Sequence, residues 1–212
     1  MNYTAVVAGA TGLIGKQIIE LVLSDERYTH VLALVRQPLA MHHDKLEQRV
    51  VDWKKLDQQS ISADHVFCCL GTTIKKVKTK EAFREVDFTF PVALAKATKA
   101  GGANTFVLIS ALGADPKSSV FYNRVKGEAE EAIRNIGFAA LHILQPSLLL
   151  GPRTEQRSGE EAAKWFFGAF GFLIPQKFKA IDSAKVARAA LIYANESDHG
   201  VFTHSSASMQ HF

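Results

Sequence analysis

Short runs of apolar and β-branched residues alternate along the chain with longer segments in which apolar residues recur at helical spacing. The apolar runs predict six strands, because strands that are buried on both faces of a parallel sheet are apolar throughout. These strands are expected at 3–8, 30–35, 48–52, 65–70, 105–109 and 140–144. Helical spacing predicts helices over 13–23, 80–100 and 120–135, with a kink at Pro91. This alternation is typical of an α/β fold with a doubly wound parallel sheet of the Rossmann type.

The pattern becomes less regular after Pro146. It predicts a loop, an aromatic helix over 162–170, a helix over 183–194 and a final strand near Val201. We find no linker and no internal repeat that would divide the chain. We therefore expect one domain over 1–212, in which a Rossmann core over 1–150 carries a small C-terminal substrate lobe over 151–212.

Composition places the chain among ordinary globular proteins, since 47% of its residues are hydrophobic and 22% are charged. The net charge of +4 raises the question of a nucleic-acid partner. The basic residues are scattered, however, and only the segment 75–80 is densely basic. A solvated loop near an anionic ligand explains this segment better than a docking surface does, so we expect no nucleic-acid partner.

Several features indicate a reducing compartment and no membrane span. Cys68 and Cys69 are adjacent in an apolar run, where they cannot ordinarily bridge each other. No basic segment precedes the first apolar stretch, as a signal peptide would require. The longest apolar block, 165–174, is too short to cross a bilayer. We therefore expect a cytoplasmic protein.

A glycine-rich turn follows the first predicted strand and opens the first predicted helix. Its sequence is Gly9-Ala10-Thr11-Gly12-Leu13-Ile14-Gly15. Two glycines let the backbone turn tightly and approach a pyrophosphate, which then accepts N–H bonds at the positive end of the helix. The third lets the helix pack closely on the sheet. The alternative is a tight turn in another α/β fold, but the position at the first strand-to-helix turn favours dinucleotide binding.

Arg36 distinguishes between the two nicotinamide cofactors. Folds that prefer NAD place an acidic residue at the end of the second strand, where it binds the ribose 2′-hydroxyl. Here the chain reads Leu34-Val35-Arg36-Gln37. A guanidinium suits a 2′-phosphate, so we expect NADP(H), although Arg36 taken alone is also compatible with a surface charge.

Candidate catalytic residues follow the fifth strand. Ser110 ends that strand, and Tyr122 and Lys126 lie four residues apart on one face of the next predicted helix. A tyrosine and a lysine at this spacing usually mark only a helix face. Together with the glycine loop and a strand-end serine they predict hydride transfer, in which Tyr122 donates a proton, Lys126 lowers its pKa and Ser110 holds the carbonyl oxygen.

The chain resembles the atypical short-chain dehydrogenases/reductases, especially the oxidoreductases related to the Tat-interacting protein, and more distantly NmrA-like proteins and sugar epimerases. The likeness runs from about Val6 to Gly151-Pro152 and continues more weakly over 180–190. It rests on Gly9 to Gly15, Cys68-Cys69-Leu70-Gly71-Thr72-Thr73, Val86-Asp87, Ser110-Ala111-Leu112-Gly113-Ala114, Tyr122-Asn123-Arg124-Val125-Lys126-Gly127-Glu128 and Gln145-Pro146-Ser147-Leu148-Leu149-Leu150-Gly151-Pro152-Arg153. The chain departs from many reductases of the superfamily at Leu70-Gly71-Thr72, where they carry Asn-Ala-Gly.

The resemblance implies a role for further residues. Asp52 would lie near the adenine, and Leu70, Gly71, Thr72 and Thr73 would line the adenine ribose and pyrophosphate. Pro146, Ser147 and Leu148 would border the nicotinamide. Ser110, Tyr122 and Lys126 would form the catalytic set, with Tyr122 and Lys126 also at the cofactor and Lys126 bonding the nicotinamide ribose.

Two other features carry less weight. His42-His43 are adjacent, with no second pair at ligand spacing, so we expect no metal site. The aromatic stretch 165–172 fits core packing, a lid over an apolar substrate, or an exposed surface for a membrane or a partner.

The sequence leaves three functions open. The first is NADPH-dependent reduction of a carbonyl, or the reverse oxidation, on a small molecule. The aromatic tail favours an apolar or planar one, and Lys75, Lys76 and Arg153 leave an anionic one open. The second is a non-catalytic NADP(H) sensor that acts through protein contacts, for which a protein partner or a homodimer is expected. The third is an epimerase or dehydratase that retains its cofactor through the cycle. The sequence does not identify the substrate.

Overall fold

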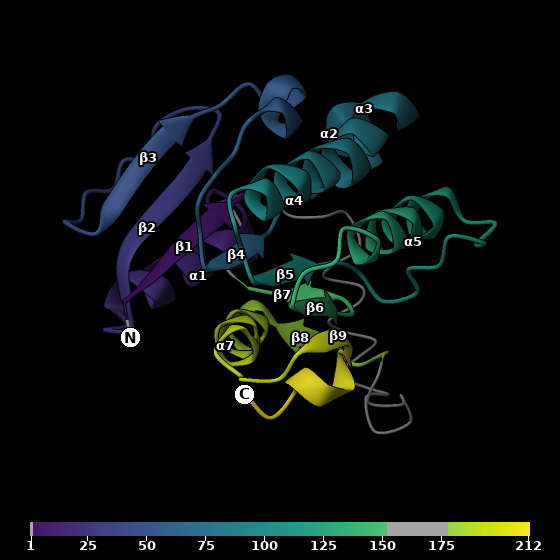
Figure 1. Cartoon of the computed structure of the whole chain (residues 1–212). Helices are drawn as coiled ribbons and strands as arrows, with labels where there is room; N and C mark the ends of the chain where they lie inside the picture. The colour runs from purple at the N-terminus through teal and green to yellow at the C-terminus, as the bar shows by residue number, and fades with distance from the viewer. Residues whose placement is uncertain (1, 152–177) are drawn as a thin grey trace.

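A parallel sheet of seven strands forms the centre of the structure, in the order β3-β2-β1-β4-β5-β6-β9 (Figure 1). The computed structural model describes residues 2–151 and 178–212. The strands are β1 (Tyr3–Ala8), β2 (Tyr28–Val35), β3 (Leu46–Val50), β4 (His65–Cys68), β5 (Thr105–Ile109), β6 (Ala140–Gln145) and β9 (Gly200–Ser205). Each neighbouring pair is parallel. The predicted Rossmann-type α/β fold is therefore confirmed.

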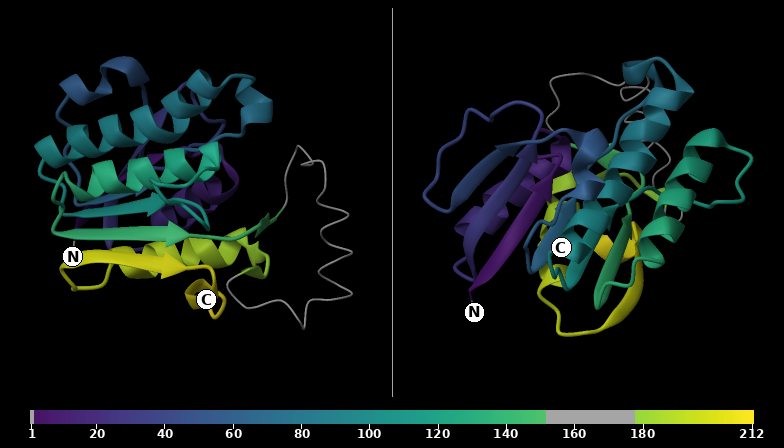
Figure 2. Two further views of the ribbon diagram at one scale, coloured as in Figure 1. Left: turned by 90° about the vertical axis from the view of Figure 1, so that its right-hand side faces the viewer. Right: turned by 45° about the horizontal axis from the view of Figure 1, so that its top comes forward.

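Helices cover both faces of this sheet, as the two further views show (Figure 2). Helices α1 (Leu13–Ser24) and α7 (Ser183–Ala194) pack on one face with Ala5 and Val7. On the other face, α4 (Phe90–Ala100), α5 (Phe121–Arg134) and the 3-10 turn η1 (Trp53–Gln58) pack with Val6 and Ala8. Successive strand residues point to opposite faces, so a strand that is apolar throughout feeds two cores.

The segment predicted as one helix over 80–100 is less regular than expected. It consists of α3 (Lys80–Arg84), a π-helical turn η2 (Glu85–Thr89) and α4, and it follows the short helix α2 (Ile74–Val77). Pro91 lies in the first turn of α4, where its missing N–H is tolerated, so the irregular turn precedes the proline. The π turn carries Asp87 into the interior, where it is 1% exposed.

The C-terminal segment contributes to the main sheet. Strand β9 pairs with β6, and α7 packs against α1, so the sheet extends beyond residue 150. A second sheet of two short strands joins β7 (Leu149–Leu150) to β8 (Ile181–Asp182), and the 3-10 turn η5 (Ala207–Met209) follows β9. The helix expected over 162–170 and the aromatic stretch 165–172 lie outside the described residues.

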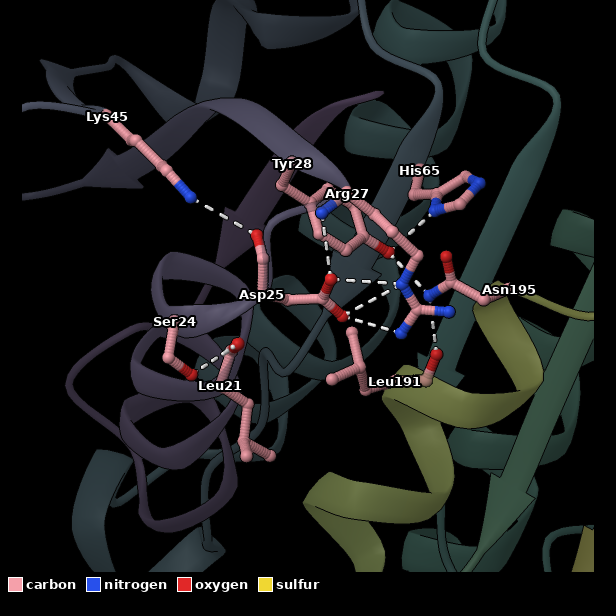
Figure 3. Close-up of polar contacts among 9 residues, drawn as sticks. All are labelled: Leu21, Ser24, Asp25, Arg27, Tyr28, Lys45, His65, Leu191 and Asn195. Carbon is pink, nitrogen blue, oxygen red and sulfur yellow. Dashed lines mark hydrogen bonds and ion pairs between the residues drawn. The ribbon is translucent and has the colours of Figure 1, made fainter. Parts of the chain in front are cut away.

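A polar network lies at the amino ends of β2 and β4, away from the glycine loop (Figure 3). The Tyr28 hydroxyl is 2.7 Å from His65 Nδ1 and accepts a hydrogen bond of 2.8 Å from Asn195 Nδ2. Burial raises the pKa of Tyr28 well above its ordinary value and lowers the pKa of His65 to about 4. The buried imidazole is therefore neutral at physiological pH.

A second histidine pair joins the last two strands of the sheet. His142 Nδ1 on β6 lies 3.1 Å from His204 Nε2 on β9. The ring of Tyr193 on α7 stacks on His204, with 3.7 Å between the ring centroids. Burial lowers the pKa of both histidines to about 4. This cluster therefore links β9, β6 and α7 through neutral rings.

Candidate functional site

The glycine loop between β1 and α1 is packed too closely for side chains at two positions. Gly9 has φ +86°, and a Cβ there would come within 2.6 Å of the Cys69 carbonyl oxygen. A Cβ at Gly15 would lie 2.1 Å from the carbonyl oxygen of Gly9. The loop thus lies directly on the end of β4, and α1 lies directly on the loop, as the sequence predicted for a close helix–sheet approach.

The N-terminus of α1 offers its first amides without competition from a side chain. The capping residue is Gly12, no capping side chain bonds to these amides, and the first turn contains no acidic residue. Thr11 and Gly12 are exposed and Leu13 is half-buried, whereas Ile14 and Gly15 are buried. An anionic pyrophosphate fits this arrangement, because the exposed N–H groups and the helix dipole both favour negative charge.

Two residues expected at the adenosine end follow strands on the same side of β1. Arg36 comes directly after β2 and is exposed. Asp52 follows β3, is exposed, and accepts a 3.1 Å hydrogen bond from the backbone N–H of Lys54 at the start of η1. The carboxyl ends of parallel strands meet at one edge of a sheet, so Arg36 shares the edge of the glycine loop.

The loop after β4 connects the expected cofactor residues to Asp87. The Thr72 N–H donates to Asp87 Oδ2 at 2.9 Å, and Thr73 Oγ1 accepts from Lys76 N at 3.2 Å to cap α2. A Cβ at Gly71 would lie 3.5 Å from Asp87 Oδ1. Leu70 packs on the core beside α4. The loop conformation therefore depends on the buried carboxylate of Asp87, which the sequence analysis named only as part of the family resemblance and not as a site residue.

Lys126 forms a buried ion pair with the same carboxylate. Its Nζ lies 2.8 Å from Asp87 Oδ1, and the side chains are 7% and 0% exposed. Burial disfavours the charged form of Lys126, but the negative charge of Asp87 and the proximity of Tyr122 outweigh it and raise the pKa of Lys126. The site therefore holds a fixed ammonium ion beside Tyr122.

Tyr122 lies one helical turn before Lys126 on α5 and is half-buried. Its ring centroid is 5.5 Å from that of Phe83, which is fully buried on α3. This aromatic contact restricts the ring without engaging the hydroxyl. The phenol therefore stands on the helix face that carries Lys126.

Ser110 follows β5, and its N–H donates to the Leu144 carbonyl at 2.8 Å. Its hydroxyl contacts Glu130 Oε1, which also receives Gln145 Nε2 at 3.0 Å. Glu130 lies on α5 four residues after Lys126 and is 6% exposed. Ser110 is thus joined through Glu130 to α5, the helix that carries Tyr122 and Lys126, and this glutamate is a partner that the sequence analysis missed.

The residues expected near the nicotinamide tie β6 to the C-terminal segment. The Pro146 carbonyl accepts from Leu112 N at 2.9 Å, and the Leu148 carbonyl accepts from Ile181 N at 2.9 Å. Ser147 Oγ donates to the Lys179 carbonyl and lies 2.8 Å from Ser206 Oγ. These bonds fix the loop at the carboxyl end of β6.

Other chemistry finds little support in the described part of the chain. Burial raises the pKa of the Cys68 thiol to about 12, which disfavours a thiolate nucleophile. No group of three histidine, cysteine or acidic residues within 2–151 and 178–212 is arranged to hold a metal ion. Among the same residues, no helix combines the length and apolar character needed to span a membrane.

Known proteins resemble this chain in sequence and in fold. A family described as NAD(P)H-binding matches residues 9–193. Protein HTATIP2 from Rattus norvegicus is 35% identical over 186 residues, which cover 82% of this chain and 76% of that protein. Protein FMP52, mitochondrial, from Candida albicans is 28% identical over 206 residues, with 92% and 89% covered. The solved structure of MoeE5 in complex with UDP-glucose and NAD superposes with a TM-score of 0.71 at 16% identity, covering 94% of this chain and 74% of that one.

Proposed function

This chain belongs to the NAD(P)H-binding family of atypical short-chain dehydrogenases/reductases, and on that premise we propose that it is an NADP(H)-dependent oxidoreductase acting on a carbonyl. The observation that carries the proposal is the buried ammonium of Lys126, held by Asp87 one helical turn from Tyr122 and beside the loop after β4. A fixed positive charge next to a phenol favours proton transfer from that phenol.

The residues divide the reduction between them. The glycine loop over 9–15 would hold NADPH, which would supply a hydride for the carbonyl carbon. Tyr122 gives its hydroxyl proton to the carbonyl oxygen, so that an alcohol and oxidised cofactor result. Lys126 stabilises the phenolate that remains, and Ser110 holds the oxygen that receives the proton. Water returns a proton to Tyr122 before the next cycle.

We propose NADP(H) over NAD(H) because Arg36, rather than an acid, follows β2. An Arg36→Ala change is expected to weaken NADPH binding by about tenfold or more while NADH binding changes little, since only NADPH loses a charge-assisted pair. Titration calorimetry with both cofactors measures this difference. An equal loss for NADPH and NADH would contradict the assignment. Arg27→Ala serves as the charge-matched control, because Arg27 precedes the amino end of β2 whereas Arg36 follows its carboxyl end.

The first test of the activity uses the unmodified chain. NADPH and NADH are titrated by calorimetry, and the reduced nicotinamide absorbance is then followed with a panel of aldehydes and ketones, both apolar and planar. Preferred binding of NADPH with its oxidation on some carbonyl supports the proposal. Binding of neither cofactor contradicts it.

A second candidate function is an NADP(H)-binding sensor that acts through protein contacts. It is favoured by the engaged state of Ser110, whose hydroxyl contacts Glu130. Tight NADPH binding with no turnover on the whole panel would support this alternative.

The cytoplasmic location stays a prediction, because the Candida albicans relative is named as mitochondrial, and cell fractionation would decide it.

A further inference from the structure

Glu130 is a buried carboxyl group that the proposed chemistry does not use. It is 6% exposed and lies between α5, the end of β5 and the end of β6. Ser110 Oγ contacts Oε1, and Gln145 Nε2 lies 3.0 Å from Oε1 and 3.1 Å from Oε2. Because this carboxyl group is enclosed, its protonation state determines which hydrogen bonds its partners can donate and accept.

Whether Ser110 can donate a hydrogen bond to a ligand depends on the charge of Glu130. An ionised carboxylate only accepts hydrogen bonds, so it takes the single hydroxyl hydrogen of Ser110 and leaves that oxygen with lone pairs alone for a ligand. A protonated Glu130 can donate its hydrogen to Ser110 Oγ. The hydroxyl hydrogen of Ser110 is then free for a ligand oxygen. A ketone or aldehyde oxygen carries no hydrogen and needs such a donor.

We propose that Glu130 is a positioning residue that sets the direction of the Ser110 hydrogen bond, and that carbonyl reduction proceeds through the form in which Glu130 is protonated. The inference rests on the proposed carbonyl reductase function. In this proposal, the charge of Glu130 determines whether the Ser110 hydroxyl donates to a carbonyl oxygen or accepts from the hydroxyl of an alcohol.

The surroundings of Glu130 favour the protonated form more than water does. Burial raises the pKa of Glu130, and the hydrogen bonds from Ser110 and Gln145 and the charges of Arg134 and Lys126 oppose part of that rise. Arg134 and Lys126 lie on its own helix, while β5 and β6 face it with the uncharged Ser110 and Gln145. The group therefore titrates above an ordinary glutamate.

The first measurement needs no turnover. Glutamate labelled with ¹³C at the δ-carbon is incorporated, the Glu130 signal is assigned by its loss in Glu130→Gln, and it is titrated with NADPH present. The Ser110→Ala change is expected to raise the pKa of Glu130 by about one unit, because the ionised form loses a hydrogen-bond donor. A pKa of Glu130 that does not respond to Ser110→Ala overturns the inference, whatever the activity of the chain.

The second measurement is the pH profile of kcat/KM for carbonyl reduction by NADPH. In the unmodified chain, kcat/KM is expected to fall by about 10²-fold as the pH rises through the pKa measured for Glu130. This is the effect typically seen when one hydrogen-bond donor to the reacting oxygen is lost. Glu130→Gln should remove this fall, because an amide can donate to Ser110 at every pH. Glu131→Gln, the same change at an exposed neighbour, should keep it.

The outcomes separate the two levels of the proposal. A fall that persists unchanged in Glu130→Gln overturns the role of Glu130 while leaving the reductase function intact. A chain that oxidises no NADPH on any carbonyl contradicts the proposed function instead, and the NMR titration then still decides whether Glu130 and Ser110 are coupled.

Discussion

A chain that carries Tyr122→Phe is expected to bind NADPH as the unmodified chain does and to lose about 10²- to 10⁴-fold in turnover, the contribution of a positioned general acid. The change removes only the hydroxyl. The ring keeps its contact with Phe83, so the local packing and the charged Lys126 remain in place. Calorimetry measures the affinity for NADPH, and the reduced nicotinamide absorbance measures the rate.

Tyr3→Phe provides the matched control for this change, since Tyr3 lies at the amino end of β1, whereas the glycine loop follows the carboxyl end of that strand. It should leave both the affinity and the rate unaltered. If Tyr122→Phe retained full turnover, another group would have to supply the proton. If it lost NADPH affinity with no loss of rate at saturation, Tyr122 would be a cofactor contact and not the acid.

The second large effect concerns acid stability. His65 and His142 are buried as neutral imidazoles, with pKa values of about 4, whereas an unfolded histidine has a pKa of about 6.5. Between these values the unfolded chain binds more protons, so the free energy of unfolding falls as the pH falls from about 6.5 to about 4. Each of the two is expected to contribute roughly 2–3 kcal/mol to this loss. The more exposed His204 adds less.

Urea unfolding at a series of pH values between neutral and about 4 measures this loss. His142→Phe should make the dependence on pH shallower, because one of the groups that takes up a proton on unfolding is gone. His42→Phe, in an exposed loop, should leave the dependence unchanged. An identical slope in His142→Phe and in the unmodified chain would show that the pKa of His142 is not depressed.

The central strands of the sheet were predictable because they are buried on both faces. Thr105–Ile109 is buried at every position, and its predicted bounds match the structure. A short apolar run that follows a glycine pair and precedes a loop is typical of a buried strand. The exposed edge strand β3 was placed less accurately, at 48–52 where the structure has Leu46–Val50. Its half-buried and exposed residues give a weak apolar signal.

The buried acids were harder to find, because sequence spacing alone does not show which carboxylates point inward. Helix α5 carries Glu128, Glu130 and Glu131 within four positions. Glu128 pairs with Arg84 and Glu131 is exposed, so only Glu130 is buried. The available signal was its spacing of four from Lys126, which places both on one face. The burial of Asp87 could not be predicted for a different reason, because a π turn changes the helix face on which it lies.

The place of β9 in the sheet bears on how the chain folds while it is being synthesised. Strand β6 has β5 on one side, but its other edge stays open until 200–205 have left the ribosome. An unpaired edge of a parallel sheet is a template for association with other chains. We therefore expect the nascent protein to pass through a stage in which most of its sheet is formed and the outer edge of β6 is unpaired, and demand for a chaperone should be greatest at that stage.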